Sequence, residues 1–196
     1  MMTKPWDARL AAQLVKPLCG TPVTPNHLTT VRLFVGISGA LLFAHGGHAN
    51  LAAAIVVLSN FLDHTDGELA RMKGATSRFG HYYDLISDAV VTVGLFCCIG
   101  WGLVSSLGHR AIWMGVIAGL AIAAIFHLRQ VIENRLGKGA TAQPRIGGFE
   151  AEDILYLLPL VTLFDRLATF LHAAAVGAPI ALLVVFLHYR RLLASP

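Results

Sequence analysis

Four aspartates in one stretch of the chain have the residue type and spacing of a metal-binding site. Asp63 and Asp66 are three positions apart, and Asp84 and Asp88 are four positions apart. Each pair shares one face of a helix, because residues three and four apart are neighbours on a helix surface. The segment between the pairs is short, so two antiparallel helices can turn all four carboxylates toward one another.

Facing carboxylates repel one another when they are ionised, and a divalent cation relieves this repulsion. A ligand set made only of oxygen favours Mg²⁺ or Mn²⁺ over zinc. Four carboxylates supply enough oxygens for two ions that share bridging ligands, and such pairs of ions clamp phosphates in displacement reactions. The four residues therefore predict a two-metal site for phosphate chemistry.

Two glycines and an arginine beside the aspartates predict where a phosphorylated substrate would lie. Gly67 and Gly80 flank the cluster, and glycine lets a ligand or a second backbone come close. Arg71 follows Gly67 by one helical turn, and a guanidinium suits a phosphate. We therefore expect these three residues to line a diphosphate. Helix packing alone would also explain the glycines, and membrane anchoring would also explain the arginine.

Membrane-spanning helices are the elements expected to position these side chains. Of the 196 residues, 56% are hydrophobic and 13% are charged, and the mean hydropathy is +0.66. Soluble domains carry about 25% charged residues. Helices are the expected spanning form, because each one satisfies its own backbone hydrogen bonds in lipid. The basic residues lie beside apolar segments, so we expect no nucleic-acid partner.

The apolar segments predict an all-α, polytopic membrane protein with six transmembrane helices in a single domain, 1–196. The predicted spans are 28–45, 50–62, 81–104, 110–129, 152–165 and 168–189. The second span continues as a polar helical end through Arg71. We expect an N-terminal amphipathic surface helix over about 5–18, within a juxtamembrane segment 1–23, and the six-helix bundle over 24–193.

The placement of the basic residues predicts how the chain is oriented. Most lysines and arginines fall in 4–16, 71–78, 129–145 and 190–191, which share one side if the chain crosses six times. Arg110 and Arg166 fall on the other side. This asymmetry places the N- and C-termini in the cytoplasm. The short loops favour a bacterial inner membrane, where membrane lipids surround the helices.

The run Asp63-x2-Asp66-Gly67-x2-Ala70-Arg71-x8-Gly80-x3-Asp84-x3-Asp88 resembles the signature of the class I CDP-alcohol phosphotransferase (CDP-alcohol phosphatidyltransferase) family. The six spans, the surface helix and the run Pro25-Asn26-x-Leu28-Thr29 extend the resemblance over most of the chain. Members of this family displace CMP from a CDP-linked donor with an alcohol hydroxyl. The resemblance therefore implies a phospholipid-synthesising transferase, and it implies a homodimer.

Carried over by position, the resemblance assigns roles to individual residues. The metal ligands would be Asp63, Asp66, Asp84 and Asp88. Asp88 would also be the base that accepts the proton of the alcohol. Gly67, Arg71 and Ser77 match positions near the nucleotide and its phosphates, and the segment from Asn26 to Thr29 matches one that binds the cytidine part. Helix capping would also explain Ser77 and Asn26 to Thr29.

The sequence fits more than one donor and more than one acceptor. CDP-diacylglycerol with a small alcohol acceptor is the first choice, and transfer of a CDP-linked head group to diacylglycerol is the second. Family members with phosphorylated or inositol acceptors often carry a Glu-Arg-x-Glu-Arg-like run, whereas this chain has Glu150, Glu152 and Asp153 without the arginines. Acidic groups suit an ammonium, so an amino alcohol is slightly favoured over a phosphorylated polyol. The same acids could instead stabilise a helix start.

Two other functions would use some of the same features. A membrane prenyltransferase also has aspartate-rich motifs and Mg²⁺, and it would bind an isoprenoid diphosphate. Such enzymes are longer chains with about nine spans. They lack the Gly-x2-Ala-Arg element found at 67–71. A cation channel or carrier would need acidic residues at several depths, whereas these cluster near one membrane face.

Overall fold

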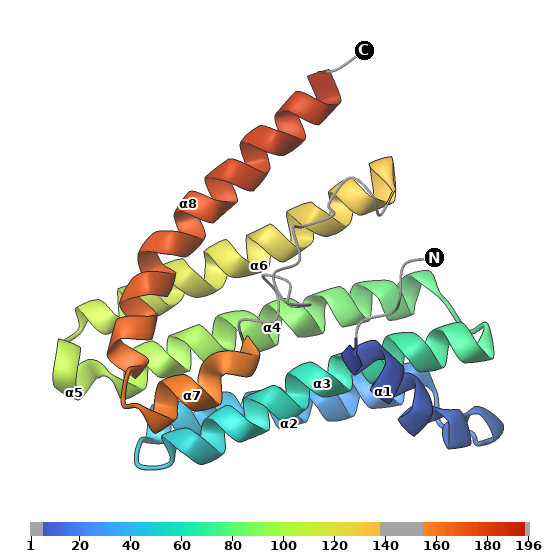
Figure 1. Cartoon of the computed structure of the whole chain (residues 1–196), viewed down its shortest axis with the longest axis horizontal. Coiled ribbons are helices and arrows are strands. Elements are labelled where there is room, and N and C mark those ends of the chain that lie inside the picture. Colours follow the sequence, from blue (N-terminus) through green and yellow to red (C-terminus); the bar gives the residue numbers. More distant parts are fainter. Residues whose placement is uncertain (1–5, 138–154, 195–196) are drawn as a thin grey trace.

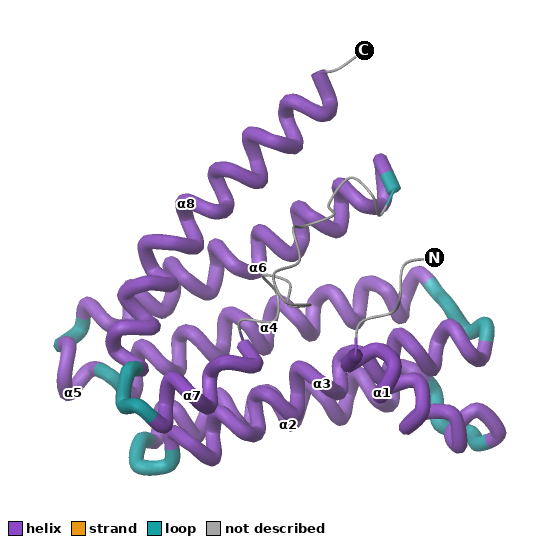
Figure 2. The backbone as a smooth tube through the Cα atoms, in the orientation of Figure 1, coloured by secondary structure: helices purple, strands orange, loops and turns teal. Residues whose placement is uncertain are grey.

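The structure, a computed structural model, describes residues 6–137 and 155–194, and every regular element in these residues is a helix (Figure 2). The long helices are α2 (Pro25–His45), α3 (Ala49–Lys73), α4 (Arg78–Gly102), α6 (Arg110–Leu136) and α8 (Leu167–Ala194). The short ones are α1 (Trp6–Val15), the 3-10 helix η1 (Lys16–Gly20), α5 (Val104–Leu107) and α7 (Leu158–Leu163). The predicted all-helical fold is confirmed.

Helix α2 lies at the centre of the half of the molecule that carries the aspartates. It packs against both α3 and α4, and these two helices pack against α2 more than against each other. Helix α4 then packs on α6, and α6 packs on α8. Figure 1 shows α8 leaving the bundle at an angle toward the C-terminus, while α2, α3, α4 and α6 run side by side.

A glycine makes the close packing of α2 possible. A Cβ on Gly36 would lie 2.7 Å from Ser59 Oγ of α3 and 2.7 Å from Val91 Cγ1 of α4. Since real Cβ atoms do not approach other atoms so closely, any larger residue would push α2 away from one of its neighbours. Small residues at helix crossings are typical of membrane bundles.

The ends of the helices near the aspartates are fixed by caps and by one lysine. Thr24 caps α2, and Pro25 occupies the first turn, where proline is favoured. Ser77 Oγ accepts a hydrogen bond of 2.9 Å from the backbone N–H of Gly80 at the start of α4. Lys73, the last residue of α3, donates to the carbonyl oxygens of Thr21 and Val23, each at 2.7 Å. These bonds tie the start of α2 to the end of α3.

Among the described residues, four helices are long and apolar enough to cross a membrane, and they cover Pro25–His45, Arg78–Gly102, Arg110–Glu133 and Leu167–Arg191. They correspond to the first, third, fourth and sixth predicted spans, so the chain is an integral membrane protein. The count of six spans is not confirmed. Helix α3 is long, but its second half carries the charged site residues, and the predicted fifth span is described only from residue 155, where α7 is short.

The predicted N-terminal surface segment contains a helix, α1, which packs against α3. Ala11 and Val15 are buried in this contact, while Leu10 and Leu14 are exposed. Its packing places α1 beside the end of α3 that carries the aspartates (Figure 1). The position of α1 at a membrane surface stays a prediction.

Candidate metal and substrate site

Three of the four predicted metal ligands converge on one point. Asp63, Asp66 and Asp84 each offer a carboxylate oxygen, and these three atoms lie within 4.8 Å of one another. Asp66 is almost fully buried, with 6% of its side chain exposed, whereas Asp63 and Asp84 are exposed by 31% and 35%. The group thus forms a cup of oxygens that is closed at Asp66 and accessible from outside at the other two residues.

An arginine from α2 occupies the middle of the aspartate cluster. The Nη1 atom of Arg32 lies 2.8 Å from Asp63 Oδ1 and also contacts Asp88 Oδ1, and its Nη2 atom lies 2.9 Å from Asp84 Oδ1. The Nε atom is 4.0 Å from Asp66 Oδ2. One guanidinium therefore reaches all four aspartates, which come from two different helices. Asp88, with 37% of its side chain exposed, joins the cluster through this contact.

Hydroxyl groups hold the inner side of the cluster in place. Thr29 Oγ1 on α2 donates to Asp66 Oδ2 at 2.6 Å, which is much closer than its 3.3 Å distance to the Pro25 carbonyl oxygen. Ser59 Oγ on α3 donates to the backbone carbonyl of Arg32 at 3.0 Å. The hydroxyl of Thr29 is thus directed at Asp66, and its predicted contact with the cytidine part of a donor stays a prediction.

Gly67 and Arg71 lie together on α3, next to an acid that the sequence interpretation left out. A Cβ on Gly67 would meet only the Arg71 Nη2 atom, at 3.8 Å, so the surface beside this glycine is open. Arg71 is 55% exposed, and its Nη2 atom donates to Glu68 Oε1 at 2.8 Å. Glu68 is 2% exposed. The buried carboxylate therefore anchors an accessible guanidinium beside an open patch of helix backbone.

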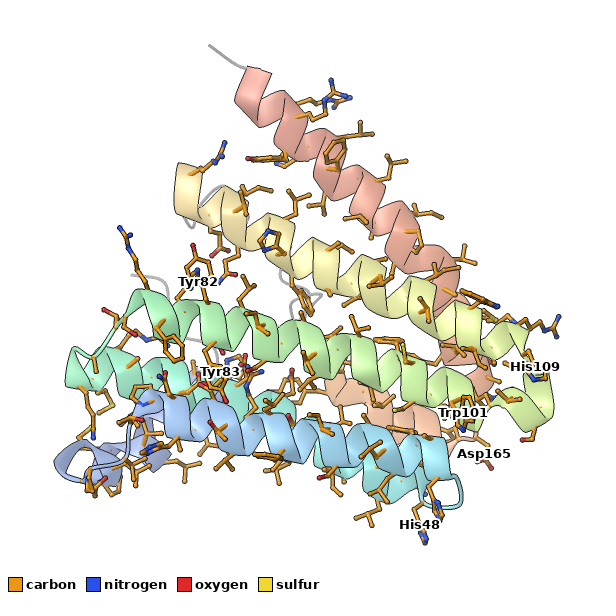
Figure 3. All side chains as sticks on the ribbon, turned by 180° about the vertical axis from the view of Figure 1, so that it is seen from behind. His48, Tyr82, Tyr83, Trp101, His109 and Asp165 are labelled. Atoms are coloured by element: carbon orange, nitrogen blue, oxygen red, sulfur yellow. The ribbon has the colours of Figure 1, made fainter. Side chains whose placement is uncertain are left out.

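The other predicted donor-binding residues gather where α2 and α4 begin. A Cβ on Gly80 would lie 3.1 Å from both Asn26 Oδ1 and Ser77 Oγ, so this glycine makes room for two polar side chains. Close by, the hydroxyl groups of Thr30 and Tyr83 are 2.8 Å apart. In Figure 3, Tyr83 points from α4 toward α2, whereas Tyr82 points to the opposite side of α4. The predicted donor-binding residues therefore form two groups, one on α3 and one where α2 and α4 begin.

The sequence interpretation missed Arg32 and Glu68. Arg32 is a lone charged residue inside the predicted apolar span 28–45. A charge within a membrane segment indicates a functional site and a nearby partner of opposite charge, so the signal was present. Glu68 lies three positions before Arg71, which is the spacing of an ion pair on one helix. The acids Glu150, Glu152 and Asp153, which bear on the acceptor, lie outside the described residues.

Comparison with known families agrees with this geometry. A family model described as CDP-alcohol phosphatidyltransferase matches residues 22–190, which include all of the predicted site residues. The chain belongs to this family. The resemblance seen in the aspartate motif is thereby confirmed for most of the chain.

Relatives and solved structures of this family include phosphatidylinositol phosphate synthases. The enzyme of that name from Corynebacterium glutamicum is 39% identical over 84 residues. The matched stretch covers 43% of this chain and 38% of that relative, so the chain spans well under half of the relative's length.

The fold is shared with the phosphatidylinositol phosphate synthase of Mycobacterium tuberculosis. Its crystal structure with CDP-DAG bound has a TM-score of 0.70 at 21% identity and covers 91% of this chain and 92% of that one. Its complex with manganese and citrate has a TM-score of 0.68 at 20% identity, with 93% and 88% covered. Among the described residues, the arrangement of helices is thus that of a CDP-alcohol phosphatidyltransferase.

Proposed function

We propose that this chain synthesises a phospholipid by displacing CMP from CDP-diacylglycerol with the hydroxyl of a small alcohol. The observation that carries the proposal is the convergence of carboxylate oxygens from Asp63, Asp66 and Asp84 within 4.8 Å, beside the accessible carboxylate of Asp88. Membership of the CDP-alcohol phosphatidyltransferase family supports it. The crystal structure of the M. tuberculosis relative with CDP-DAG supports the choice of donor.

The aspartate cluster fits a hard divalent cation. Its donors are all oxygens, which suit Mg²⁺ or Mn²⁺. Arg32 supplies one positive charge to four carboxylates, which leaves three formal negative charges for bound ions. Asp63, Asp66, Asp84 and Asp88 would hold the ions, and the manganese complex of the relative supports the choice of a divalent ion. When bound, two such ions neutralise the diphosphate and stabilise the CMP leaving group.

Asp88 is the proposed general base. Its side chain is the most exposed of the four, and it lies outside the group of three that converge most closely. In the proposed step the alcohol oxygen forms a bond to the phosphorus that carries diacylglycerol, and the bond from this phosphorus to the CMP oxygen breaks. The alcohol proton moves to the Asp88 carboxylate, and CMP leaves with the bonding electrons. A positioned carboxylate suffices because the leaving group is already stabilised.

Two groups of side chains would bind the donor, one on α3 and one at the starts of α2 and α4. Arg71 would bind a phosphate, because its guanidinium is accessible and Glu68 fixes its position. Gly67 leaves room for the diphosphate to approach α3. Asn26, Ser77 and Gly80, at the ends of α2 and α4, would receive the cytidine part, and Thr29 would contribute through Asp66.

Two classes of alcohol are candidates for the acceptor. The names of the relatives point to an inositol phosphate. The acids at 150–153, without accompanying arginines, favour an amino alcohol instead. Both groups of alcohols therefore belong in the assay, and the alcohol that supports the fastest CMP release identifies the acceptor.

The proposed enzyme crosses a bacterial inner membrane six times and works as a homodimer with both termini in the cytoplasm. The polar half of α3 and the predicted fifth span would complete the count of six. The four apolar helices and the asymmetry of the basic residues support this topology. Labelling of single cysteines from each side of the membrane tests it, and light scattering of the protein in detergent tests the dimer.

The decisive experiment measures CMP release by the purified protein in lipid nanodiscs. CDP-diacylglycerol is supplied with inositol phosphate, inositol, glycerol 3-phosphate, serine, ethanolamine or choline, each with and without Mg²⁺ or Mn²⁺. We expect CMP only when the donor, a matching alcohol and a metal ion are all present. Asp88→Asn should abolish turnover, whereas Asp165→Asn, at the opposite end of the bundle (Figure 3), should leave it unchanged.

Near-normal turnover of Asp88→Asn would remove the proposed base. Metal-independent CMP release would remove the role of the aspartate cluster. The alternative function, a Mg²⁺-dependent prenyltransferase, predicts that an isoprenoid diphosphate is consumed and that CDP-diacylglycerol is not. The family match favours the phosphatidyltransferase.

A further inference from the structure

Arg32 is the feature of the site that the proposed reaction does not use. Its side chain is 3% exposed and contacts carboxylates on α3 and α4 at the same time. The residue lies within the apolar helix α2, where an unpaired charge is costly. The guanidinium is therefore an integral part of the cluster. Its burial depends on the negative charges of these acids.

The position of Arg32 is fixed from both ends. Its backbone carbonyl accepts a hydrogen bond from Ser59 of α3, at 3.0 Å. Its Nη1 and Nη2 atoms are held by Asp63, Asp84 and Asp88. Its Nε atom is buried and has no hydrogen-bond partner among the described residues. The guanidinium thus has one unused donor, which faces Asp66 at 4.0 Å.

The charges in the cluster show what this cation does. Without Arg32, four carboxylates on two helices would face one another, and their mutual repulsion would push α3 and α4 apart. A guanidinium that bridges the two helices offsets one charge and adds directional bonds to both. A divalent ion would act at the same place on the same oxygens, so Arg32 and the ion share ligands.

We propose that Arg32 is a built-in counter-cation that holds the aspartate cluster together before a metal ion arrives and that lowers the affinity of the cluster for divalent ions. The inference rests on the proposed function only in taking the cluster to bind such ions. Metal entry then requires Nη1 to release its shared hold on Asp63 and Asp88, which frees Asp88 to act on the alcohol. Arg32 is therefore a positioning residue.

Arg32→Gln tests the proposal, because glutamine keeps hydrogen-bonding capacity and removes the charge. Without metal, its melting temperature should fall by about 10 °C, since breaking a buried ion pair leaves uncompensated charge. Added Mn²⁺ should restore most of this loss and should stabilise the variant more than the wild type. Mn²⁺ should also bind about tenfold more tightly, because a positive charge beside the ion has been removed.

Arg78→Gln is the matched control, because it removes an exposed positive charge at the start of α4, outside the cluster. It should match the wild type in both melting temperature and Mn²⁺ binding, measured by the paramagnetic resonance signal of free Mn²⁺. If Arg32→Gln cannot be purified without metal, it is purified in Mn²⁺. Arg32→Lys, which keeps the charge but loses the planar guanidinium with its several N–H donors, is then measured with and without Mn²⁺. Lysine should give a Mn²⁺ affinity nearer to the wild type than glutamine does.

The outcomes separate this inference from the proposed function. Equal Mn²⁺ affinity and equal stabilisation by Mn²⁺ in the wild type and Arg32→Gln would overturn the counter-cation role. If in addition the KM for CDP-diacylglycerol rose, Arg32 would instead be a phosphate ligand. Failure of the wild type and every variant to bind Mn²⁺ would overturn the proposed metal site itself.

Discussion

The hydrogen bond from Thr29 to Asp66 gives a sharp test of how α2 supports the metal site. Thr29→Val keeps the shape of the side chain and removes only the hydroxyl that donates to Asp66 Oδ2 at 2.6 Å. Both residues are buried, with 2% and 5% exposed, so water cannot easily replace the lost donor. Asp66 would then keep its charge but lose the bond that orients it.

The size of the effect follows from the kind of bond. A hydrogen bond to a charged acceptor is worth about 1.5–3 kcal/mol. Loss of a group that orients a metal ligand typically costs about 10–100-fold in metal affinity, which is the same range of free energy. We therefore expect the Mg²⁺ or Mn²⁺ concentration for half-maximal CMP release to rise by about 10–100-fold, while the rate at saturating metal changes less.

The assay titrates the metal at saturating CDP-diacylglycerol and acceptor. Thr29→Ser is the control, because serine keeps the hydroxyl and should restore most of the metal affinity. A metal requirement that is unchanged in Thr29→Val would refute the reasoning. A rise in the KM for CDP-diacylglycerol without a change in the metal requirement would show that Thr29 contacts the donor.

Three further predictions concern helix packing, a helix cap and a turn. Gly100→Ala would drive a Cβ into the Ala111 carbonyl of α6 and should cost about 1–3 kcal/mol in thermal unfolding, whereas Gly94→Ala on the same helix meets open space and should be nearly neutral. Ser77→Ala should lower the free energy of unfolding by about 1 kcal/mol, because it removes the cap of α4. Ser77→Asp should keep the stability, because aspartate also caps helices. Loss of turnover in Ser77→Asp alone would indicate that the nucleotide contacts this residue. Asp165 has φ 53°, so Asp165→Gly should raise the melting temperature by about 2–4 °C, and a decrease would contradict this.

Much of the arrangement could be predicted because it depends on helical periodicity and apolarity. The aspartate pairs share helix faces, so their register on α3 and α4 follows from spacing alone, and the structure brings Asp63, Asp66 and Asp84 together. The strongly apolar spans correspond to α2, α4, α6 and α8. Helix α3 also continues as a polar end, as expected, and stops at Lys73 before the left-handed Gly74.

The remaining features could not be predicted because they depend on how distant helices pack. The sequence suggested that α3 and α4 face each other directly, whereas each of them packs against α2 far more than against the other. Asp84 and Asp88 are 52 and 56 residues away from Arg32 in the chain, so no local spacing pairs them. The same holds for Gly80, whose neighbour Asn26 lies at the start of another helix. Spacing along a single helix identifies the aspartates as metal ligands. It does not identify Arg32, the residue on another helix that neutralises part of their charge.

Helix α2 therefore acts as both spacer and counter-ion for the site. Gly36, one helical turn after Arg32, lets α2 lie between Ser59 of α3 and Val91 of α4 at a distance that excludes any larger side chain. With α2 in this position, one guanidinium contacts aspartates of both α3 and α4, whose carboxylate oxygens lie within 4.8 Å of one another. A larger separation of the helices would leave Arg32 without part of its ligand set. Gly36 and Arg32, on the same helix, thus together set the distance between the aspartates of α3 and those of α4.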